Sequence, residues 1–440
     1  MPPRPFAGVN TKPVLQTSPV TRAARANYLF VIPVVFYRTG PGKFASESAF
    51  AEHLRYLKTQ LNAEVERITI VAPMMTKSQF ERIKAGLTEI DEQAEGIFFL
   101  PLVDDGLDRL QFFLRLPFVL NEVRRAVEGA DVVHGGISYN LFRPFEFPAI
   151  LYAAALGKKT IVVEDIDMRN NARMNFKTGR WSRKSYLLNR FLYDPIRALE
   201  HKLAARLCSL SLFKGKDLVS DYGKGRPSVK NFLDVAFFAD QIIPQPQLDT
   251  KIAARADAPL QLVFAGRLTG YKGVDHCLRA VAHARGLGGK LHFTIIGGGE
   301  EEENLKRLTH ELSLDDAVTF TGPIPFGPKL FDRLQKSDLL LGAPQSEDTP
   351  RNVFDAMASA VPVLAYDTYY YRDLTDTGAI QTVPWLDIEA MGSAIAEHAR
   401  DRSRLREMMI KAVAFARENT QEIWLDRRIE WIKAIVLTGN

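Results

Sequence analysis

Cysteine is nearly absent from this chain of 440 residues, because only Cys208 and Cys277 occur and both lie in apolar surroundings. Two cysteines cannot build a disulfide framework, so we expect two buried free thiols and a reducing compartment. Long hydrophobic runs are also missing. The longest, residues 28–37 and 147–156, fall short of the roughly 18 to 20 apolar residues that a spanning helix requires. The sequence therefore predicts no membrane span and a cytoplasmic protein.

Residues 1–26 contain no acidic side chain and no apolar central region, but they carry four cations and five prolines. This composition differs from that of a secretory signal and is typical of a disordered basic tail. From residue 27 onward, short apolar runs alternate with amphipathic stretches such as 48–61 and 107–127. That alternation is typical of parallel sheets that are covered by helices on both faces.

The apolar runs form two groups on either side of a proline-bearing stretch without periodicity. The expected strands are residues 28–37, 67–72, 96–100, 131–134, 160–163, 209–213, 260–264, 291–296, 317–320, 338–341 and 361–365. A chain of this length is long for one core and suits two α/β domains. We expect a Rossmann-like domain at 27–235, a linker at 236–258, a second Rossmann-like domain at 259–418 and a final helix at 419–440.

Two acidic residues, Glu347 and Asp355, lie eight positions apart where a loop enters a helix. If Pro350 begins that helix, Glu347 lies on the preceding loop and Asp355 on the second turn. Upstream, an apolar strand ends in a glycine turn that carries Arg267 and Lys272. Carboxylates suit the hydroxyls of a sugar and the two cations suit a diphosphate. Together they indicate a sugar-nucleotide site.

In the C-terminal half these elements resemble those of the retaining glycosyltransferases of the GT-B fold, glycosyltransferase family 4 in particular. The matching elements, in the family's order, are Gly266-Arg267-Leu268 with Lys272-Gly273, Gly297 to Gly299, Phe320-Thr321-Gly322, and Glu347 with Asp355 followed by Ala356-Met357-Ala358 and Pro362-Val363. The resemblance implies two Rossmann-like domains with parallel sheets that face each other across a cleft. It also implies that a last helix, which carries Trp424 and Trp431 here, crosses back to the N-terminal domain.

The resemblance further implies a nucleotide-diphosphate sugar as donor substrate, a glycan or lipid-linked acceptor, and no cofactor. Arg267 and Lys272 would stabilise the charge that develops on the β-phosphate. Glu347 would hold the transferred sugar, and Gly266 and Asp355 would contact the rest of the donor. Asp355 is one methylene shorter than the family's glutamate, which affects the expected ribose contact.

In the N-terminal half the resemblance places a glycine loop with Gly40 and Gly42 against the diphosphate. His134 ends a strand whose end faces the acceptor in the family, and Glu164 stands where many relatives have a histidine. Residues Asp165 to Asp167 also match the Asp-x-Asp metal signature of another glycosyltransferase fold. Because two cations are already available for the diphosphate, we expect no essential metal.

Three tyrosines, Tyr369 to Tyr371, stand where relatives usually carry a glycine pair. Tyrosine does not readily take the left-handed backbone that glycine permits, so we expect a reshaped loop that could stack on a sugar face.

Residues 169–206 hold ten Lys or Arg against two acids, interleaved with aromatic side chains. A basic amphipathic surface of this kind suits an anionic membrane or a lipid-diphosphate acceptor. No recognition motif for nucleic acid accompanies the charge.

The leading hypothesis is thus a glycosyltransferase of polysaccharide or glycoconjugate biosynthesis. The alternatives are a catalytically silent GT-B partner subunit and another nucleotide-sugar enzyme of similar fold, such as an epimerase or a phosphorylase.

Overall fold

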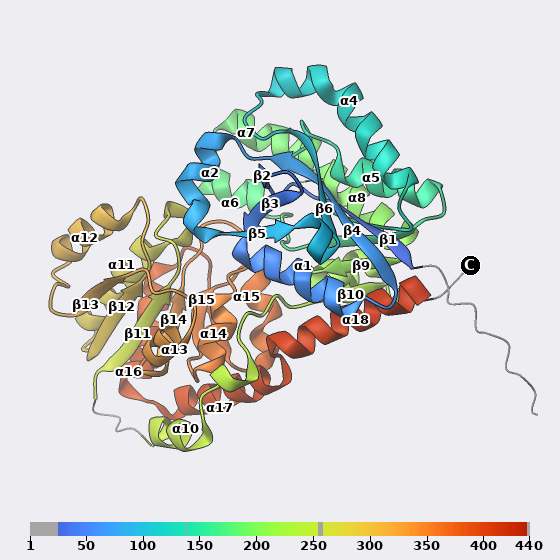
Figure 1. The fold of residues 1–440 in the computed structure, drawn as a ribbon. Coiled ribbons are helices and arrows are strands. Elements are labelled where there is room, and N and C mark those ends of the chain that lie inside the picture. The colour runs from blue at the N-terminus through green and yellow to red at the C-terminus, as the bar shows by residue number, and fades with distance from the viewer. Residues whose placement is uncertain (1–24, 139, 254–257, 438–440) are drawn as a thin grey trace, which may run out of the picture.

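The computed structural model describes residues 25–138, 140–253 and 258–437, which form two α/β domains (Figure 1). The expected tail lies almost entirely outside these ranges. The N-terminal sheet has seven parallel strands in the order β10-β9-β8-β7-β1-β4-β6. These are β1 (Ala26–Val31), β4 (Val65–Met74), β6 (Ile97–Asp104), β7 (Val132–Gly136), β8 (Lys159–Glu164), β9 (Leu210–Phe213) and β10 (Val229–Asn231).

Helices cover both faces of this sheet because alternate strand residues point to opposite sides. On β1, Leu29 and Val31 pack in a cluster with helices α4 and α5, whereas Tyr28 and Phe30 pack in a cluster with α1 and the last helix, α18 (Gln421–Leu437). The helices of this domain include α1 (Ser48–Gln60), α2 (Lys77–Ile83), α3 (Glu92–Glu95), α4 (Arg109–Glu128), α5 (Glu146–Ala155), α6 (Asn171–Lys177), α7 (Arg183–Leu188), the π-helical turn η2 (Asn189–Tyr193), α8 (Asp194–Leu207) and α9 (Lys216–Leu218).

The C-terminal sheet has six parallel strands in the order β13-β12-β11-β14-β15-β16. They are β11 (Leu260–Ala265), β12 (Leu291–Ile296), β13 (Val318–Gly322), β14 (Leu339–Gly342), β15 (Val363–Tyr366) and β16 (Ile380–Val383). The helices of this domain include α11 (Val274–Gly286), α12 (Glu302–Glu311), α13 (Pro328–Gln335), α14 (Asn352–Ala358), α15 (Tyr369–Asp373), α16 (Ile388–Arg400) and α17 (Ser403–Glu418). The two sheets and the domain pair confirm the expected fold class.

The segment 28–37, expected as one strand, is divided. β1 ends at Val31, and the chain continues as β2 (Tyr37–Gly40) in a separate antiparallel sheet with β3 (Lys43–Glu47) and β5 (Leu87–Asp91). Pro33 falls in the break and has no N–H for a sheet ladder. The expected linker also contains helix α10 (Gln245–Ile252), which begins after Pro244.

The turn with Gly40 and Gly42 joins β2 to β3, and Gly42 takes a φ of 67° there. Its carbonyl accepts a hydrogen bond of 2.9 Å from the backbone N–H of Glu92, the first residue of α3. Helix α3 immediately precedes β6, so the turn lies at the amino-terminal edge of the sheet. Ligand sites of parallel sheets lie at the opposite edge. The position of Gly40 and Gly42 therefore argues against the predicted diphosphate contact.

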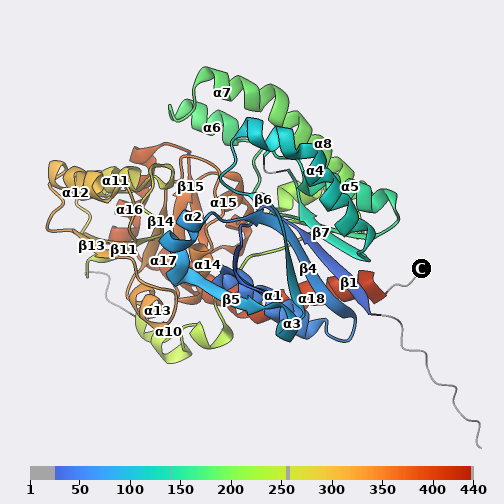
Figure 2. The same cartoon turned by 45° about the horizontal axis from the view of Figure 1, so that its top comes forward.

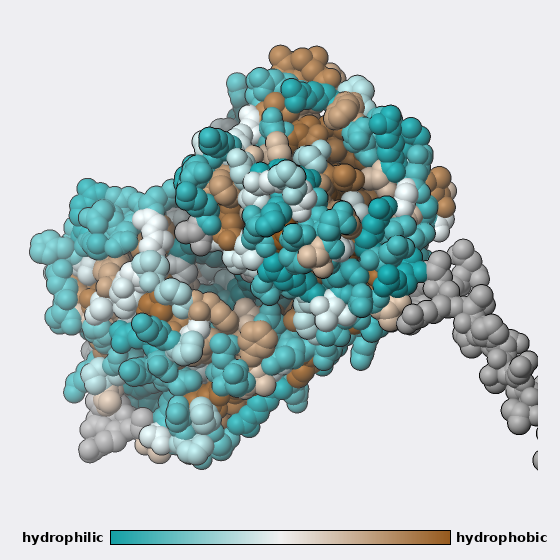
Figure 3. All heavy atoms as spheres, viewed as in Figure 1, coloured by the Kyte–Doolittle hydropathy of each residue, from teal (hydrophilic) through white to brown (hydrophobic). Residues whose placement is uncertain are grey.

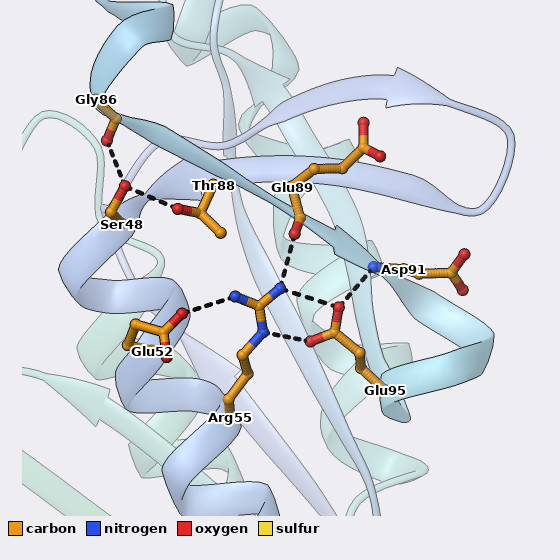
Figure 4. A network of polar contacts seen from close by, with 8 residues as sticks. All are labelled: Ser48, Glu52, Arg55, Gly86, Thr88, Glu89, Asp91 and Glu95. Atoms are coloured by element: carbon orange, nitrogen blue, oxygen red, sulfur yellow. Dashed lines mark hydrogen bonds and ion pairs between the residues drawn. The ribbon is translucent and has the colours of Figure 1, made fainter.

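Arg55 of α1 ties the small sheet and α3 to the domain (Figure 4). Its guanidinium donates to both carboxylate oxygens of Glu95 at 2.7 and 3.1 Å, to Glu52 at 2.8 Å and to the Glu89 carbonyl at 2.8 Å. Glu95 in turn accepts a bond from the backbone of Asp91. One planar cation thus joins α1, β5 and α3.

Helix α18 (Gln421–Leu437) leaves the C-terminal domain and runs along the N-terminal one, as the two views show (Figures 1 and 2). Tyr56 donates to Asp426 at 2.9 Å, and Lys433 lies 3.6 Å from Glu64. Trp424 is 9% exposed and belongs to a hydrophobic cluster that spans both domains. The expected crossing helix is thereby confirmed.

Both cysteines are free and buried, as expected. Within the described ranges, no helix combines the length and the apolar content that crossing a bilayer requires.

We expect Arg55→Gln to lower the free energy of unfolding by about 1 to 3 kcal/mol, because Glu95 would lose its charged partner. Urea unfolding followed by circular dichroism measures this. Arg124→Gln is the matched control, since Arg124 and Glu128 form a pair with side chains 50% and 42% exposed. Such a surface pair contributes less than about 1 kcal/mol. Equal effects of the two substitutions would contradict the role given to Arg55.

Candidate active site

The carboxyl-terminal edges of the two sheets lie next to each other, and side chains connect them across the interdomain cleft. Lys216, which follows β9, donates its backbone N–H to Asp373 at 2.7 Å and its Nζ to Asp376 at 2.9 Å. The guanidinium of Arg169 lies 5.1 Å from the ring centroid of Tyr369. Ligands of open α/β sheets bind at this edge, so the cleft is the first place to look for a site.

Glu347 lies on the loop that follows β14, and only 6% of the residue is exposed. One carboxyl oxygen, Oε1, has no hydrogen-bond partner among the described residues. Burial, and then the Asp167 carboxylate of the N-terminal domain, raise the pKa of Glu347 to about 8, although the Tyr369 backbone N–H partly offsets this. A buried carboxyl with an unpaired oxygen is costly, which makes it a candidate for binding a ligand.

Asp355 is similar, with 5% of the residue exposed and Oδ1 unpaired among the described residues. Burial raises the pKa of Asp355 to about 7, opposed by the nearby Arg351. The helix that carries it begins at Asn352, later than the expected start at Pro350, so Asp355 lies in its first turn. Both acids that the sequence singled out are therefore recessed in the C-terminal domain.

Lys272 is held by an acid that the sequence analysis missed. Its Nζ lies 2.5 Å from Oδ2 of Asp348, and the two side chains are 14% and 17% exposed. Asp348 is the neighbour of Glu347, but the pairing joins residues 76 positions apart, which no local pattern reveals. Arg267 is exposed and lies 3.5 Å from the hydroxyl of Tyr271, whose ring centroid is 5.2 Å from Lys272 Nζ. The two predicted cations thus flank Tyr271.

The glycines of the matching elements let loops approach closely. A Cβ on Gly297 would lie 1.8 Å from the carbonyl oxygen of Gly266, and one on Gly273 would lie 1.8 Å from that of Ala343. Both glycines also have positive φ, 146° and 65°. The N–H of Gly266 already bonds Ile296 at 2.9 Å, so Gly266 shapes the turn, and its N–H is not free for the predicted donor contact.

The tyrosine segment forms the short helix α15, so its backbone is right-handed, whereas a glycine pair would permit a left-handed turn. Tyr370 and Tyr371 are buried, and the Tyr370 hydroxyl donates to the Pro350 carbonyl at 3.0 Å. Tyr369 alone of the three is partly exposed, with the guanidinium groups of Arg169 and Arg372 at 5.1 and 5.6 Å from its ring. Only Tyr369 is therefore placed to meet a ligand.

His134 lies within β7, next to Phe30 in the sheet, and not at the strand's end. Its Nδ1 is 2.8 Å from the Tyr28 hydroxyl, and its ring packs 4.5 Å from that of Phe30. Burial lowers the pKa of His134 to about 3, so the imidazole is neutral. These are the surroundings of a packed histidine, and they give no support to its predicted role at the acceptor.

Glu164 ends β8 at the cleft edge. Burial, together with the neighbouring Asp165, raises the pKa of Glu164 well above its usual range. Asp167 engages Arg169 through both carboxylate oxygens, at 2.9 Å from Nε and 2.6 Å from Nη2. Asp167 is thus committed to an arginine. No group of three or more metal-ligating side chains is found among the residues that the structure describes.

A cavity of about 140 Å³ extends the cleft between α6 and the loops after β15 and β16. Its lining residues are Asn170, Arg173, Met174, Lys177, Asp367 and Trp385. The Trp385 indole is fixed by a bond of 3.0 Å to the Pro344 carbonyl. Arg173 and Lys177 of α6 therefore line this cavity from the N-terminal domain, and Trp385 lines it from the C-terminal domain.

Comparison with known proteins agrees with this architecture. Residues 247–414 match the family model of glycosyl transferases group 1. The chain is 32% identical over 106 residues to an uncharacterized glycosyltransferase of Haemophilus influenzae and 30% identical over 181 residues to the D-inositol 3-phosphate glycosyltransferase of Pseudarthrobacter chlorophenolicus. The matches cover 24% and 38% of this chain, and 29% and 41% of those relatives. The chain therefore spans less than half the length of either relative.

Several solved structures share the whole fold. HepE of Anabaena in complex with UDP superposes with a TM-score of 0.59 at 14% identity, over 93% of this chain and 99% of HepE. WaaG, a glycosyltransferase involved in lipopolysaccharide biosynthesis, gives 0.57 at 12% identity, over 93% and 100%. Sucrose-phosphate synthase of Thermosynechococcus elongatus gives 0.60 at 14% identity, over 94% and 100%. The chain thus has the GT-B fold, and its residues 247–414 are similar to the glycosyl transferases group 1.

The raised pKa of Glu347 predicts a pH-dependent gain in stability for Glu347→Gln. The folded protein binds this proton more tightly than the unfolded chain, so ionising Glu347 destabilises the fold as the pH rises from its usual pKa of 4.5 through about 8. In the ligand-free protein, Glu347→Gln should raise the melting temperature more at about pH 8.5 than at about pH 5.5. Glu407→Gln, at an exposed position of α17, is the control and should show no such difference. A gain independent of pH would contradict the burial argument.

Proposed function

We propose that this GT-B protein, with its similarity to the glycosyl transferases group 1, is an enzyme that moves a sugar from a nucleotide-diphosphate donor to a glycan or lipid-linked acceptor. The reaction would keep the anomeric configuration of the donor and serve polysaccharide or glycoconjugate biosynthesis. One observation carries the proposal. Glu347 and Asp355 are buried carboxyls with unpaired oxygens beside the Lys272–Asp348 pair, in the cleft between two Rossmann-like domains.

The positions of Lys272 and Arg267 support a role for these two cations in the departure of the nucleoside diphosphate from the sugar. Breaking the bond between sugar and diphosphate leaves negative charge on the β-phosphate, which fixed positive charge stabilises. Asp348 holds Lys272 in place in the free protein, so the ammonium need not reorganise greatly when a phosphate arrives. Arg267, on the other side of Tyr271, can contribute a second, planar set of donors.

Glu347 supports recognition of the sugar. With a pKa of about 8, its carboxyl is protonated at neutral pH in the ligand-free cleft and offers one donor and one acceptor to sugar hydroxyls. When positive charge develops at the sugar during transfer, the ionised form becomes favourable, and stabilising a charge that appears only then accelerates the reaction. Asp355 would bind the ribose, a contact that is the same before and during transfer.

The acceptor would approach from the N-terminal domain, where Asp167 lies near Glu347 and the cavity with Trp385 extends the cleft. We also propose that the basic segment 169–206 lies against an anionic membrane surface, where each cation contributes on the order of 1 kcal/mol.

The bound UDP and glucose named for HepE make UDP-sugars the first donors to test. A thermal-shift screen of UDP-, GDP- and ADP-sugars would identify the donor, because a ligand at a hundred times its dissociation constant stabilises by about 2.7 kcal/mol.

With the donor identified, Arg267→Ala and Lys272→Ala should each lower kcat by roughly a hundredfold or more, as loss of a preorganised charge contact does. Release of nucleoside diphosphate measures this. Lys290→Ala is the control, because Lys290 is exposed just before β12, at the opposite edge of the sheet. Activity of the two cleft variants within about twofold of the parent would overturn their assignment.

Glu347→Gln and Asp355→Asn should give different kinetic signatures. Glutamine replaces a neutral carboxyl in the resting site, so donor affinity should change little while turnover falls by roughly tenfold or more. Asp355→Asn should weaken donor and free nucleoside diphosphate by the same factor. Isothermal titration and a sugar-release assay separate the two. A parent protein without turnover, together with two variants that bind donor as the parent does, would instead identify a catalytically silent module.

A further inference from the structure

Helix α4 has two apolar faces, of which only one is buried. The inner face packs in the core of the N-terminal domain through Phe112, Val119, Val123 and Val127, each at most 3% exposed. The outer face carries Leu110, Phe113, Leu114 and Phe118, which are 67%, 66%, 71% and 58% exposed. We call these four side chains the α4 outer face.

The spacing of the α4 outer face brings its members together. Residues separated by three, four or eight positions lie on one side of a helix, so the four side chains form a continuous stripe. The helix forms the upper edge of the molecule in Figure 1, and hydrophobic surface gathers at that edge in Figure 3. Scattered exposed apolar residues are normal, but an apolar stripe opposite the buried one indicates a surface that is covered in use.

The stripe adjoins the basic segment. The guanidinium of Arg109, at the start of α4, lies 4.7 Å from the ring of Phe142, and that ring lies 6.0 Å from the ring of Tyr193 in η2. Both views place α7 beside the first turns of α4 (Figures 1 and 2). The end of α7 and the turn η2 add a second ridge of exposed apolar side chains, namely Leu188, Phe191 and Leu192.

Charge decides what covers this surface. Residues 181–193, which include α7 and η2, carry the exposed cations Arg183, Lys184 and Arg190 and no acid. A second copy of the chain, docked through the same face, would bring these cations against their equivalents, which is repulsive. An anionic bilayer offers both an apolar interior for the stripe and negative headgroups for the cations.

We propose that the α4 outer face inserts into the interfacial layer of an anionic membrane, with Arg183, Lys184 and Arg190 at the headgroups. The inference rests on the membrane contact proposed above and names the side chains that enter the lipid. It would hold the N-terminal domain at the bilayer, within reach of an acceptor that is anchored in lipid.

Vesicle sedimentation tests the inference, with phosphatidylcholine vesicles that contain about a third phosphatidylglycerol, at low and at high salt. The double variant Phe113→Ser with Phe118→Ser should bind at least about tenfold more weakly than the parent at both salt concentrations, because apolar burial is not screened. The triple variant Arg183→Gln, Lys184→Gln and Arg190→Gln should weaken binding chiefly at low salt. Ile410→Ser, at an apolar position 51% exposed on α17 of the other domain, should bind like the parent.

A direct readout comes from Phe113→Trp, whose emission should shift to the blue when vesicles are added. Equal binding of the parent and the serine double variant, with no shift of that emission, would overturn the insertion of α4 even if the cation variant binds weakly. A parent that does not bind vesicles would end both α4 insertion and the membrane contact, whereas hydrolysis of a soluble donor would still report on the transferase. A dimer of the parent that the serine variant abolishes, without vesicle binding, would show that the face binds a second copy.

Discussion

Burial of carboxyl groups without hydrogen-bond partners is the constraint on which the site depends. Glu347 and Asp355 are 6% and 5% exposed, and each keeps one oxygen unpaired among the described residues. Leaving such a group unsatisfied destabilises the ligand-free fold, and both groups respond with a raised pKa. The ligand that satisfies them recovers this cost, so a site that is poor for stability is well suited to binding. The close approach of Gly273 to the Ala343 carbonyl serves the same end, because it brings the turn with Lys272 against the loop that carries Glu347.

The position of Glu347 depends on both domains. Asp167, across the cleft, raises the pKa of Glu347. Arg169 binds Asp167 and also lies over the ring of Tyr369, whose backbone N–H bonds Glu347. Helix α18 and the contact of Lys216 with Asp373 hold the two domains in this arrangement. Any change in the angle between the domains would therefore change the charge around Glu347 as well as the width of the cleft. In the proposed function, recognition of the sugar would therefore be coupled through one carboxyl to the arrangement of the two domains.

Much of the architecture could be predicted from sequence because parallel strands, buried on both faces, are continuous apolar runs. The strand at 291–296 has the expected bounds, and the final helix at 421–437 lies within the expected segment 419–440. Glu347, Asp355 and Lys272 were predicted as site residues because their motifs are local. The pairing of Lys272 with Asp348 could not be identified, since it joins distant parts of the chain. The hairpin with Gly40 and Gly42 resembled a phosphate loop, but its strands pair in a separate sheet whose partner, β5, lies far along the sequence. His134 matched the family's local pattern, but in the structure it packs against Tyr28 and Phe30 of the adjacent strand β1. That contact joins distant parts of the sequence, so no local pattern could reveal it.

The most direct test of the central claim is a crystal structure of the protein with the donor that stabilises it best in the thermal-shift screen. The account predicts the diphosphate between Arg267 and Lys272, the transferred sugar within hydrogen-bond distance of Glu347, and the ribose at Asp355. A donor bound elsewhere, or a diphosphate in the cleft that contacts neither cation while both carboxyls remain unpaired, would contradict it.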